Sequence, residues 1–311
     1  MPHTVLISRA LPLPEIQVDG ETVHFVEISN SSIPDDARVL CSTALDQVDA
    51  KLINRLPTSV GLIANLGVGT DNIDLATAKA RNILVSNTPV VTEDTADLAF
   101  SLLLSAARRI GQNERFARAG LWSESKPMGS IGNRVHGKTL GIIGFGNIGQ
   151  AVARRASGFG MKILYWNRSP KPDAETELGV ERIEDIRQLL RASDFISLHT
   201  PLTKKTRHLI NESTLNDTKH GAVLVNTGRG ALVDESALVN ALESGQIGAC
   251  GLDVFEFEPD IHPGLLELEQ VVLTPHIGSA TSECRIDIVK RGLSNITSFL
   301  QSGEVTDFVS S

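Results

Sequence analysis

Three polar residues whose types suit the reduction of a carbonyl group lie in separate segments of the chain. Arg229 lies in VNTGRGALVDESAL, Glu258 in GLDVFEFEP and His276 in LTPHIGSAT, and each stands just after a predicted strand. Ligands of an open α/β sheet bind at the carboxyl ends of its strands. We therefore expect these three side chains to converge on one ligand.

The trio matches the needs of a 2-oxo acid reduction. Arginine offers a rigid fork of donors, so Arg229 is the expected anchor for the carboxylate and carbonyl. Histidine titrates nearest to neutral pH, so His276 is the expected proton donor to the developing alkoxide. A carboxylate beside the ring favours imidazolium and fixes its orientation, which is the role predicted for Glu258. The other seven histidines are taken as ordinary surface or core residues.

A glycine-rich turn predicts a dinucleotide site. Gly144, Gly146 and Gly149 stand between an apolar strand and an amphipathic helix that leads into another strand. Glycine is needed in this context for the tight turn, for close approach of a pyrophosphate and for helix–sheet contact. The alternative interpretation is a purely structural glycine-rich turn.

The end of the following strand predicts which dinucleotide binds. An NAD-specific site places Asp or Glu there, whereas this sequence has Asn167, Arg168 and Ser169. A carboxylate would repel the extra phosphate of NADP, but a guanidinium and a hydroxyl can hydrogen-bond it. We expect NADPH to be preferred and NADH to bind more weakly. The competing interpretation makes Arg168 a solvated surface residue.

Composition and charge narrow the class of protein. At 311 residues the chain fits two domains of ordinary size. Asp and Glu (37) outnumber Lys and Arg (29), which gives no support for nucleic acid or an anionic membrane as partner. Cys41, Cys250 and Cys284 lack metal-type spacing, so no metal is expected and a reducing cytosol is favoured. No signal peptide or membrane-spanning stretch is found, and a cytoplasmic location is expected.

Strand-like runs alternate with helical segments in both halves of the chain, which is typical of parallel sheets. Asp94 or Thr95 is the expected cap of one long helix that reaches Ala119, and a loop over 120–137 follows it. Helices are also expected over 183–192, 235–244 and 281–301. Strands are expected at 5–8, 23–28, 39–42, 61–66, 83–86, 139–143, 162–166, 194–198, 222–226, 249–254 and 271–273.

Six motifs, in this order, resemble the D-2-hydroxyacid dehydrogenase family over nearly the whole chain: NLGVGTDNIDL, TEDTADLAFSLLL, GFGNIG, NTGRG, DVFEFEP and PHIGSAT. The resemblance implies two doubly wound α/β domains. A flavodoxin-like substrate domain (1–96 and 282–311) is interrupted by a Rossmann coenzyme domain (97–281). It also implies a homodimer joined through the coenzyme domains. Asn-Arg-Ser at the strand end is similar to NADPH-dependent glyoxylate and hydroxypyruvate reductases.

The resemblance also implies roles at matching positions. Leu66, Gly67 and Val68 are expected to line the substrate site, with the backbone N–H groups of Gly67 and Val68 meeting the carboxylate. Trp122 of GLWSESKPMG is expected to reach the partner subunit's substrate pocket. The residues expected along the cofactor are Thr95, Gly144, Gly146, Asn147, Ile148, Gly149, Asn167, Arg168, Ser169, Thr200, Pro201, Thr206, Thr227, Gly228, Asp253, Gly278 and Ser279.

The expected function is reduction of glyoxylate or hydroxypyruvate to the D-2-hydroxy acid by an NAD(P)-dependent dehydrogenase. Two alternatives stay open. One is a reductase of the same family for 2-ketogluconate, phenylpyruvate or phosphohydroxypyruvate, acids that differ only beyond C2. The other is a dinucleotide-sensing protein without catalytic activity, since some corepressors resemble this family.

Overall fold

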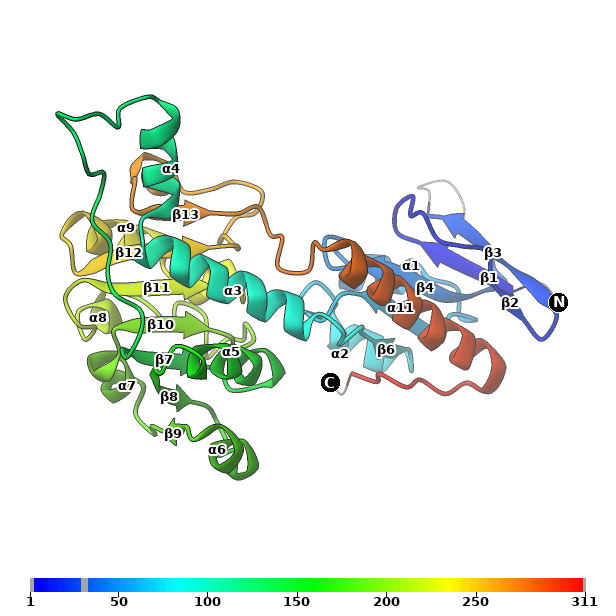
Figure 1. Cartoon of the computed structure of the whole chain (residues 1–311). Coiled ribbons are helices and arrows are strands. Elements are labelled where there is room, and N and C mark those ends of the chain that lie inside the picture. The colour runs from blue at the N-terminus through cyan, green and yellow to red at the C-terminus, as the bar shows by residue number, and fades with distance from the viewer. Residues whose placement is uncertain (1–2, 29–32, 310–311) are drawn as a thin grey trace. The chain divides into compact units, whose positions relative to one another are not determined.

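The computed structural model describes residues 3–28 and 33–309, and the chain divides into two compact units. Unit 1 combines Met1–Val91 with Ser279–Ser311, and unit 2 is Thr92–Gly278 (Figure 1). A boundary after residue 96 would cut a continuous helix, Thr92–Ala107, and the division falls before it. None of the helices in the described ranges is both long and apolar enough to cross a bilayer.

Unit 1 is built on a six-stranded sheet in the order β2-β3-β1-β4-β5-β6. Without the short antiparallel edge strand β2, the order of its parallel strands is that of a flavodoxin-like fold. The strands are β1 (His3–Ile7), β2 (Gln17–Val18), β3 (Glu21–Glu27), β4 (Ala37–Thr43), β5 (Leu62–Leu66) and β6 (Leu84–Ser86).

Helices cover both faces of this sheet because its strands alternate between two apolar clusters. Val5 and Leu62 pack in one cluster with the C-terminal helix, and their neighbours Leu6 and Ile63 pack in the other. The helices are α1 (Ala50–Arg55), α2 (Leu75–Ala80) and α11 (Ser282–Ser302). The C-terminal segment thus supplies core to the unit that the N-terminal segment begins.

Unit 2 is built on a seven-stranded, all-parallel sheet in the order β13-β12-β11-β10-β7-β8-β9. This is the order of a Rossmann fold, with the switch point between β7 and β10. The expected fold class is confirmed. The strands are β7 (Thr139–Ile143), β8 (Lys162–Trp166), β9 (Glu181–Arg182), β10 (Phe195–Leu198), β11 (Ala222–Asn226), β12 (Ile247–Leu252) and β13 (Val271–Leu273).

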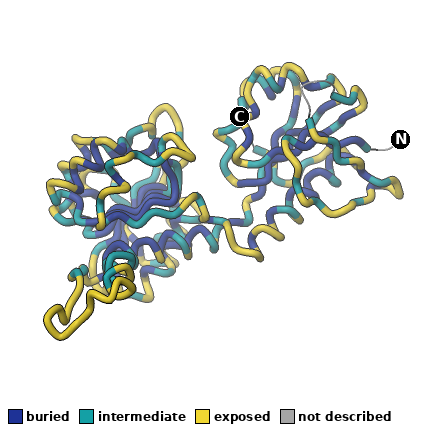
Figure 2. Tube along the Cα trace, turned by 90° about the horizontal axis from the view of Figure 1, so that it is seen from above, coloured by how far each residue is buried: buried dark blue, intermediate teal, exposed yellow. Residues whose placement is uncertain are grey.

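Two layers of helices bury this sheet, whose central strands are dark blue in Figure 2. Leu140 and Ile142 face the layer of α3 and α5, and Ile143 faces the layer of α7 and α9. The helices of unit 2 are α3 (Thr92–Ala107), α4 (Ile110–Arg118), α5 (Asn147–Ser157), α6 (Pro172–Leu178), α7 (Ile186–Ala192), α8 (Glu212–Leu215), η1 (Gly230–Leu232), α9 (Glu235–Glu243) and α10 (Pro263–Glu267).

The expected long helix before residue 119 is wrong in two respects. It begins at Thr92 rather than after a cap at Asp94 or Thr95. It is also broken into α3 and α4, because Arg109 has a left-handed backbone (φ 55°). The Arg109 guanidinium donates to the Gly248 carbonyl at 2.8 Å, which ties the break to the start of β12.

Candidate active site

His276 and Glu258 form a hydrogen-bonded pair at the carboxyl ends of β12 and β13. His276 Nδ1 lies 2.7 Å from Glu258 Oε2, and both side chains are about one third exposed (38% and 30%). The other Glu258 oxygen accepts from the Phe255 N–H at 2.9 Å. The carboxylate is therefore fixed by its own loop, and the imidazole keeps Nε2 for a second partner.

Glu258 remains a carboxylate in this setting. Partial burial alone would raise its pKa, but hydrogen bonds from His276 and the Phe255 N–H lower it, with help from the nearby Arg229 charge. The net effect holds the pKa of Glu258 below its ordinary value. A carboxylate that stays ionised can accept a hydrogen bond from His276 Nδ1 and fix the orientation of the ring.

Asp253 positions the histidine loop. It is buried, its Oδ1 accepts from Thr274 Oγ1 and the Ile277 N–H, and its Oδ2 accepts from the Gly278 N–H, all within 2.8 Å. His276 itself has a left-handed backbone (φ 53°), and its N–H donates to the Asp253 carbonyl. Desolvation raises the pKa of Asp253, which these hydrogen bonds oppose. Asp253 is expected along the cofactor, but both of its carboxylate oxygens already accept hydrogen bonds from its own chain.

Arg229 lies near the His276–Glu258 pair because the loop after β11 packs closely against the loop after β12. A Cβ at Gly230 would lie 1.8 Å from the Phe255 carbonyl carbon, so only glycine lets the loop after β11 lie against the loop of Glu258. The Asn226 amide donates to the Arg229 carbonyl at 2.8 Å and fixes the turn. The structure therefore brings Arg229, Glu258 and His276 together in unit 2.

The glycine-rich turn has the geometry of a phosphate site. A Cβ at Gly144 (φ 94°) would meet the His199 and Thr200 backbone at 2.5 Å, and one at Gly149 would meet the Gly144 carbonyl at 2.3 Å. At Gly146, by contrast, nothing lies within 4 Å. Gly146 is also the N-cap of α5, with no side-chain cap, so Asn147 and Ile148 begin a helix whose N-terminus faces open space.

A second observation supports a bound group along this edge. The Thr227 hydroxyl, expected along the cofactor, is buried without a hydrogen-bond partner among the described residues. Such groups are costly unless a ligand or water satisfies them. The neighbouring Gly228 N–H donates to Asn226 Oδ1, so the turn itself is closed. The residues present fit a dinucleotide.

Asn167 stabilises the turn rather than leaving its side chain free. Its Oδ1 accepts from the Phe145 N–H at 3.2 Å, and its Nδ2 donates to the Ser169 carbonyl at 2.9 Å. Arg168 and Ser169 are exposed, and Arg168 has no side-chain hydrogen bond or ion pair in the described part of the chain. The guanidinium is therefore available to a ligand.

Sequence reasoning missed the support beneath this loop. Tyr165 is buried, stacks on Phe145 with ring centroids 4.1 Å apart, and its hydroxyl hydrogen-bonds Glu175. The Lys171 N–H donates to the same hydroxyl at 2.9 Å. Desolvation and the Glu175 contact raise the pKa of Tyr165 to about 12. These contacts fix both ends of the segment 166–171. The sequence signal that could have indicated this support is the single Tyr of the chain, placed near the end of a strand.

Glu235 is a second missed residue. It is a buried carboxyl at the start of α9 that accepts from the Glu256 N–H at 2.8 Å, beside the loop of Glu258. Desolvation, followed by the nearby acidic groups, raises its pKa despite that hydrogen bond. It is a support for the catalytic loop that does not itself touch His276 in a described contact.

The remaining cofactor candidates have definite local partners. A Cβ at Gly278 would lie 3.2 Å from Asp253 Oδ2 and 3.5 Å from Thr95 Cγ2, so these three residues converge in unit 2. Thr206 Oγ1 donates to the Pro201 carbonyl at 2.7 Å and shapes the loop after Thr200. Ser279 belongs to unit 1. In the described ranges no group of three His, Cys, Asp or Glu residues could hold a metal ion.

Leu66, Gly67 and Val68 form a compact turn at the carboxyl end of β5 in unit 1. The Gly67 carbonyl accepts from the Thr88 N–H at 3.1 Å, and the Val68 carbonyl accepts from the Asn87 amide at 2.8 Å. The Gly67 N–H donates to the Asn65 carbonyl at 3.1 Å. Leu66 is buried and Val68 is 36% exposed.

Trp122 lies on an exposed loop of unit 2 and makes no described contact with the catalytic trio. It is 71% exposed on the loop between α4 and β7, and its indole donates to the Pro127 carbonyl at 3.1 Å. Residues 117–129 are all exposed and are yellow in Figure 2. Leu121, Met128 and Ile131 on the same loop are exposed as well.

Comparison with known proteins gives a consistent set of relatives. Residues 100–278 match the family model described as D-isomer specific 2-hydroxyacid dehydrogenase, NAD binding domain. A glyoxylate reductase of Thermococcus litoralis is 50% identical over 271 residues, which cover 86% of this chain and 81% of the relative. A glyoxylate reductase of Korarchaeum cryptofilum is 48% identical, with 87% and 81% covered.

Solved structures agree over the full length. A glyoxylate reductase from Paecilomyes thermophila has a TM-score of 0.90 at 36% identity, covering 99% of this chain and 98% of that one. An NADPH-dependent glyoxylate/hydroxypyruvate reductase from Sinorhizobium meliloti, in complex with NADP and malonate, has a TM-score of 0.88 at 31% identity, covering 100% and 97%.

Proposed function

The chain belongs to the D-isomer specific 2-hydroxyacid dehydrogenase family, and from that premise we propose that it reduces glyoxylate to glycolate, or hydroxypyruvate to its D-2-hydroxy acid, with NADPH. It is an oxidoreductase that uses a nicotinamide dinucleotide and a small 2-oxo acid. The observation that supports the catalytic assignment is the 2.7 Å contact of His276 Nδ1 with Glu258 Oε2 beside Arg229.

Each residue of the trio has one task in this proposal. Arg229 binds the carboxylate and carbonyl of the 2-oxo acid through its guanidinium donors. A nicotinamide dinucleotide held in unit 2 would supply the hydride that C2 accepts. His276 Nε2 gives its proton to the carbonyl oxygen as negative charge develops there, and Glu258 stabilises the imidazolium before transfer and orients the ring. Solvent then returns a proton to the imidazole.

The preference for NADPH rests on the loop after β8. The exposed Arg168 guanidinium and the Ser169 hydroxyl are suited to a 2′-phosphate, and no carboxylate stands at 167–169 to repel it. Gly146 and the N-terminus of α5 would hold the pyrophosphate, and the Thr227 hydroxyl would hydrogen-bond another part of the dinucleotide. In this proposal NADH binds at the same place without the Arg168 contact.

We place the protein in the cytoplasm as a homodimer. Cys41 and Cys250 are buried thiols, which suits a reducing compartment. The exposed apolar residues Leu121, Trp122, Met128 and Ile131 gather on one loop, and such a patch favours association with a second copy. Light scattering of wild type and of a Trp122→Ser, Ile131→Ser variant tests this, with a mass shift toward the monomer expected in the variant.

A substrate panel tests the function directly. Glyoxylate, hydroxypyruvate, 2-ketogluconate, phenylpyruvate and phosphohydroxypyruvate are each assayed with NADPH and with NADH. The proposal predicts the highest kcat/KM for glyoxylate or hydroxypyruvate with NADPH. A larger kcat/KM for one of the other acids would reassign the substrate, and dinucleotide binding without turnover of any acid would indicate a sensor.

A further inference from the structure

A pocket lies at the opposite edge of the unit 2 sheet from the catalytic trio. Its cavity of about 470 Å³ opens where β7, β10 and β11 begin, and the trio follows the carboxyl ends of β11, β12 and β13. All strands of this sheet are parallel, so the two sites are separated by the length of the strands. The pocket is therefore distinct from the cofactor site.

The two walls of the pocket are held by the main chain. On one side, the Asn133 N–H donates to the Ala107 carbonyl at 2.7 Å, and a Cβ at Gly132 would meet that same carbonyl at 2.5 Å. On the other side, the Gly221 N–H donates to the Gln246 carbonyl at 3.0 Å. The pocket is thus formed before any ligand enters.

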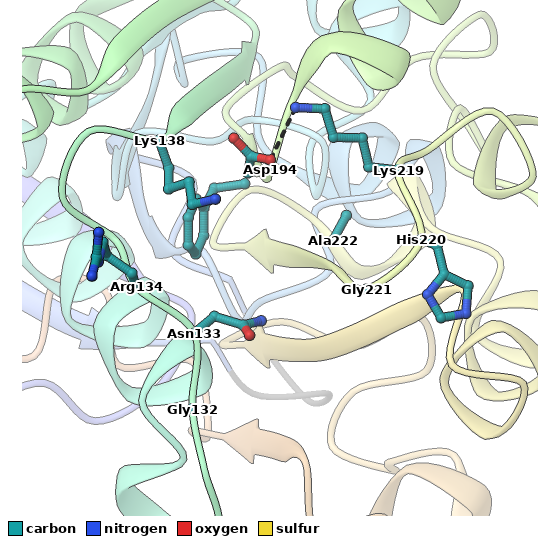
Figure 3. A pocket seen from close by; sticks show the side chains of 10 residues that line it. Gly132, Asn133, Arg134, Lys138, Asp194, Lys219, His220, Gly221 and Ala222 are labelled. Atoms are coloured by element: carbon teal, nitrogen blue, oxygen red, sulfur yellow. Dashed lines mark hydrogen bonds and ion pairs between the residues drawn. The ribbon is translucent and has the colours of Figure 1, made fainter.

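Basic side chains surround the opening, although the chain as a whole carries a net charge of −8. Lys138 extends toward the middle of the pocket, Arg134 stands at its rim, and Lys219 points at Asp194 (Figure 3). Lys219 Nζ lies 2.9 Å from Asp194 Oδ1. Neither Arg134 nor Lys138 has an ion-pair partner within residues 3–28 and 33–309.

The one acidic group of the pocket is already neutralised. Asp194 Oδ2 accepts from the Thr139 N–H at 2.9 Å while Oδ1 accepts from Lys219. Burial alone would raise the pKa of Asp194, but these two contacts and the nearby charges of Lys219 and Lys138 lower it on balance. Asp194 thus holds Lys219 at the wall, and its single negative charge is outnumbered by the positive charges of Arg134, Lys138 and Lys219, so the pocket keeps an excess of positive charge.

We propose that this pocket binds a small phosphate ester. A guanidinium provides paired donors that match a phosphate, and an ammonium adds a point charge beside it. The Asn133 side chain at the same rim can donate to a further oxygen. The cavity volume lies within the range of small-molecule sites and exceeds what a lone phosphate needs, so it leaves room for part of the organic group.

Calorimetric titration with sodium pyrophosphate, a probe that carries two phosphate groups, tests the site. NADP is present at saturation throughout, so that the phosphate positions of the cofactor site are filled. We expect saturable one-site binding that weakens as salt is added. The Arg134→Ala, Lys138→Ala double variant should bind pyrophosphate at least about tenfold more weakly, because two charge-assisted contacts are lost.

Lys51→Ala, which removes an exposed lysine in unit 1, is the matched control and should bind as wild type does. Citrate is the second probe, since it carries comparable charge on carboxylates. Absent saturation in wild type, or equal affinity in wild type and the double variant, would overturn the proposal. Tighter binding of citrate than of pyrophosphate would overturn its assignment to phosphate. The readout is binding rather than turnover, so failure here leaves the reductase proposal unaffected.

Discussion

Two parts of unit 2 differ in whether their charged side chains are paired with other side chains. In the catalytic corner, defined as Arg229, Glu258 and His276, the acid and the imidazole are paired with each other and their loops are fixed by backbone contacts. In the selector loop, defined as residues 167–171, Arg168 is exposed and has no side-chain partner among the described residues, whereas Tyr165 and Lys171 at the ends of the loop are fixed by hydrogen bonds. Proton transfer needs its groups set before substrate arrives, whereas recognition of a phosphate needs a cation that is still free.

The largest effect should come from removing the proton donor. His276→Ala should lower kcat for reduction of glyoxylate by about 10² to 10⁴, the range for loss of a general acid. Steady-state NADPH oxidation measures it, with tight binding of NADPH retained as the control. A kcat close to wild type would show that the catalytic corner is not where the proton comes from.

Replacing Arg168, the exposed cation of the selector loop, should weaken the binding of NADPH and leave the binding of NADH unchanged. Arg168→Ala should raise KM for NADPH by about 10- to 100-fold, the equivalent of one charged hydrogen bond of about 1.5–3 kcal/mol. KM for NADH and kcat with either cofactor should stay unchanged. Equal weakening of both cofactors would mean that Arg168 shapes the loop and does not recognise the phosphate.

Removing the support beneath the selector loop should have a smaller effect of the same kind. Tyr165→Phe keeps the stacked ring but loses the hydrogen bonds to Glu175 and the Lys171 N–H. We expect KM for NADPH to rise about 2- to 10-fold, as for a neutral hydrogen bond, with kcat unchanged. Phe145→Leu, which removes the stacking partner, serves as a comparison. An unchanged KM for NADPH in Tyr165→Phe would show that the loop needs no such support.

The smallest expected effect is on thermal stability. It should be seen for Glu258 of the catalytic corner and not for Arg168 of the selector loop. Because the folded-state pKa of Glu258 is lowered, its carboxylate stabilises the fold above its ordinary pKa of about 4.3 and loses that contribution as the pH falls through the lower folded value. Glu258→Gln should therefore lower Tm at pH 7 by a few degrees, and the difference from wild type should shrink below about pH 4.

Exposed Glu243→Gln is the control for that measurement and should leave Tm unchanged at both pH values. Arg168→Ala should do the same at neutral pH, because its side chain makes no described contact. A constant Tm difference between Glu258→Gln and wild type at all pH values would contradict the ionised state of Glu258.

The sequence predicts which residues form the catalytic site better than it predicts the hydrogen-bond and packing partners that hold them. Arg229, Glu258 and His276 could be selected because each follows a strand, and parallel strands end at one edge. That Asp253 holds the His276 loop, and that Gly230 is glycine because Phe255 lies 1.8 Å from its missing Cβ, could not be predicted. These facts depend on distances between segments far apart in the chain.

The break between α3 and α4 shows the same limit for secondary structure. Apolar periodicity continues across Arg109, so local pattern predicts one helix. The break depends on a contact of Arg109 with Gly248, which lies 139 residues further along the chain. The central strands of unit 2, by contrast, are buried on both faces. Four strands of the sheet, β7, β8, β11 and β13, have the bounds that their apolar runs predict.

A double-mutant cycle on Glu258 and His276 tests the central claim most directly. If Glu258 acts by holding the imidazole charged and oriented, Glu258→Gln should lower kcat by about tenfold or more in wild type and by less than about twofold when His276 is already Ala. The same fold-reduction of kcat in both backgrounds would contradict the account, since Glu258 would then act on the reaction without His276.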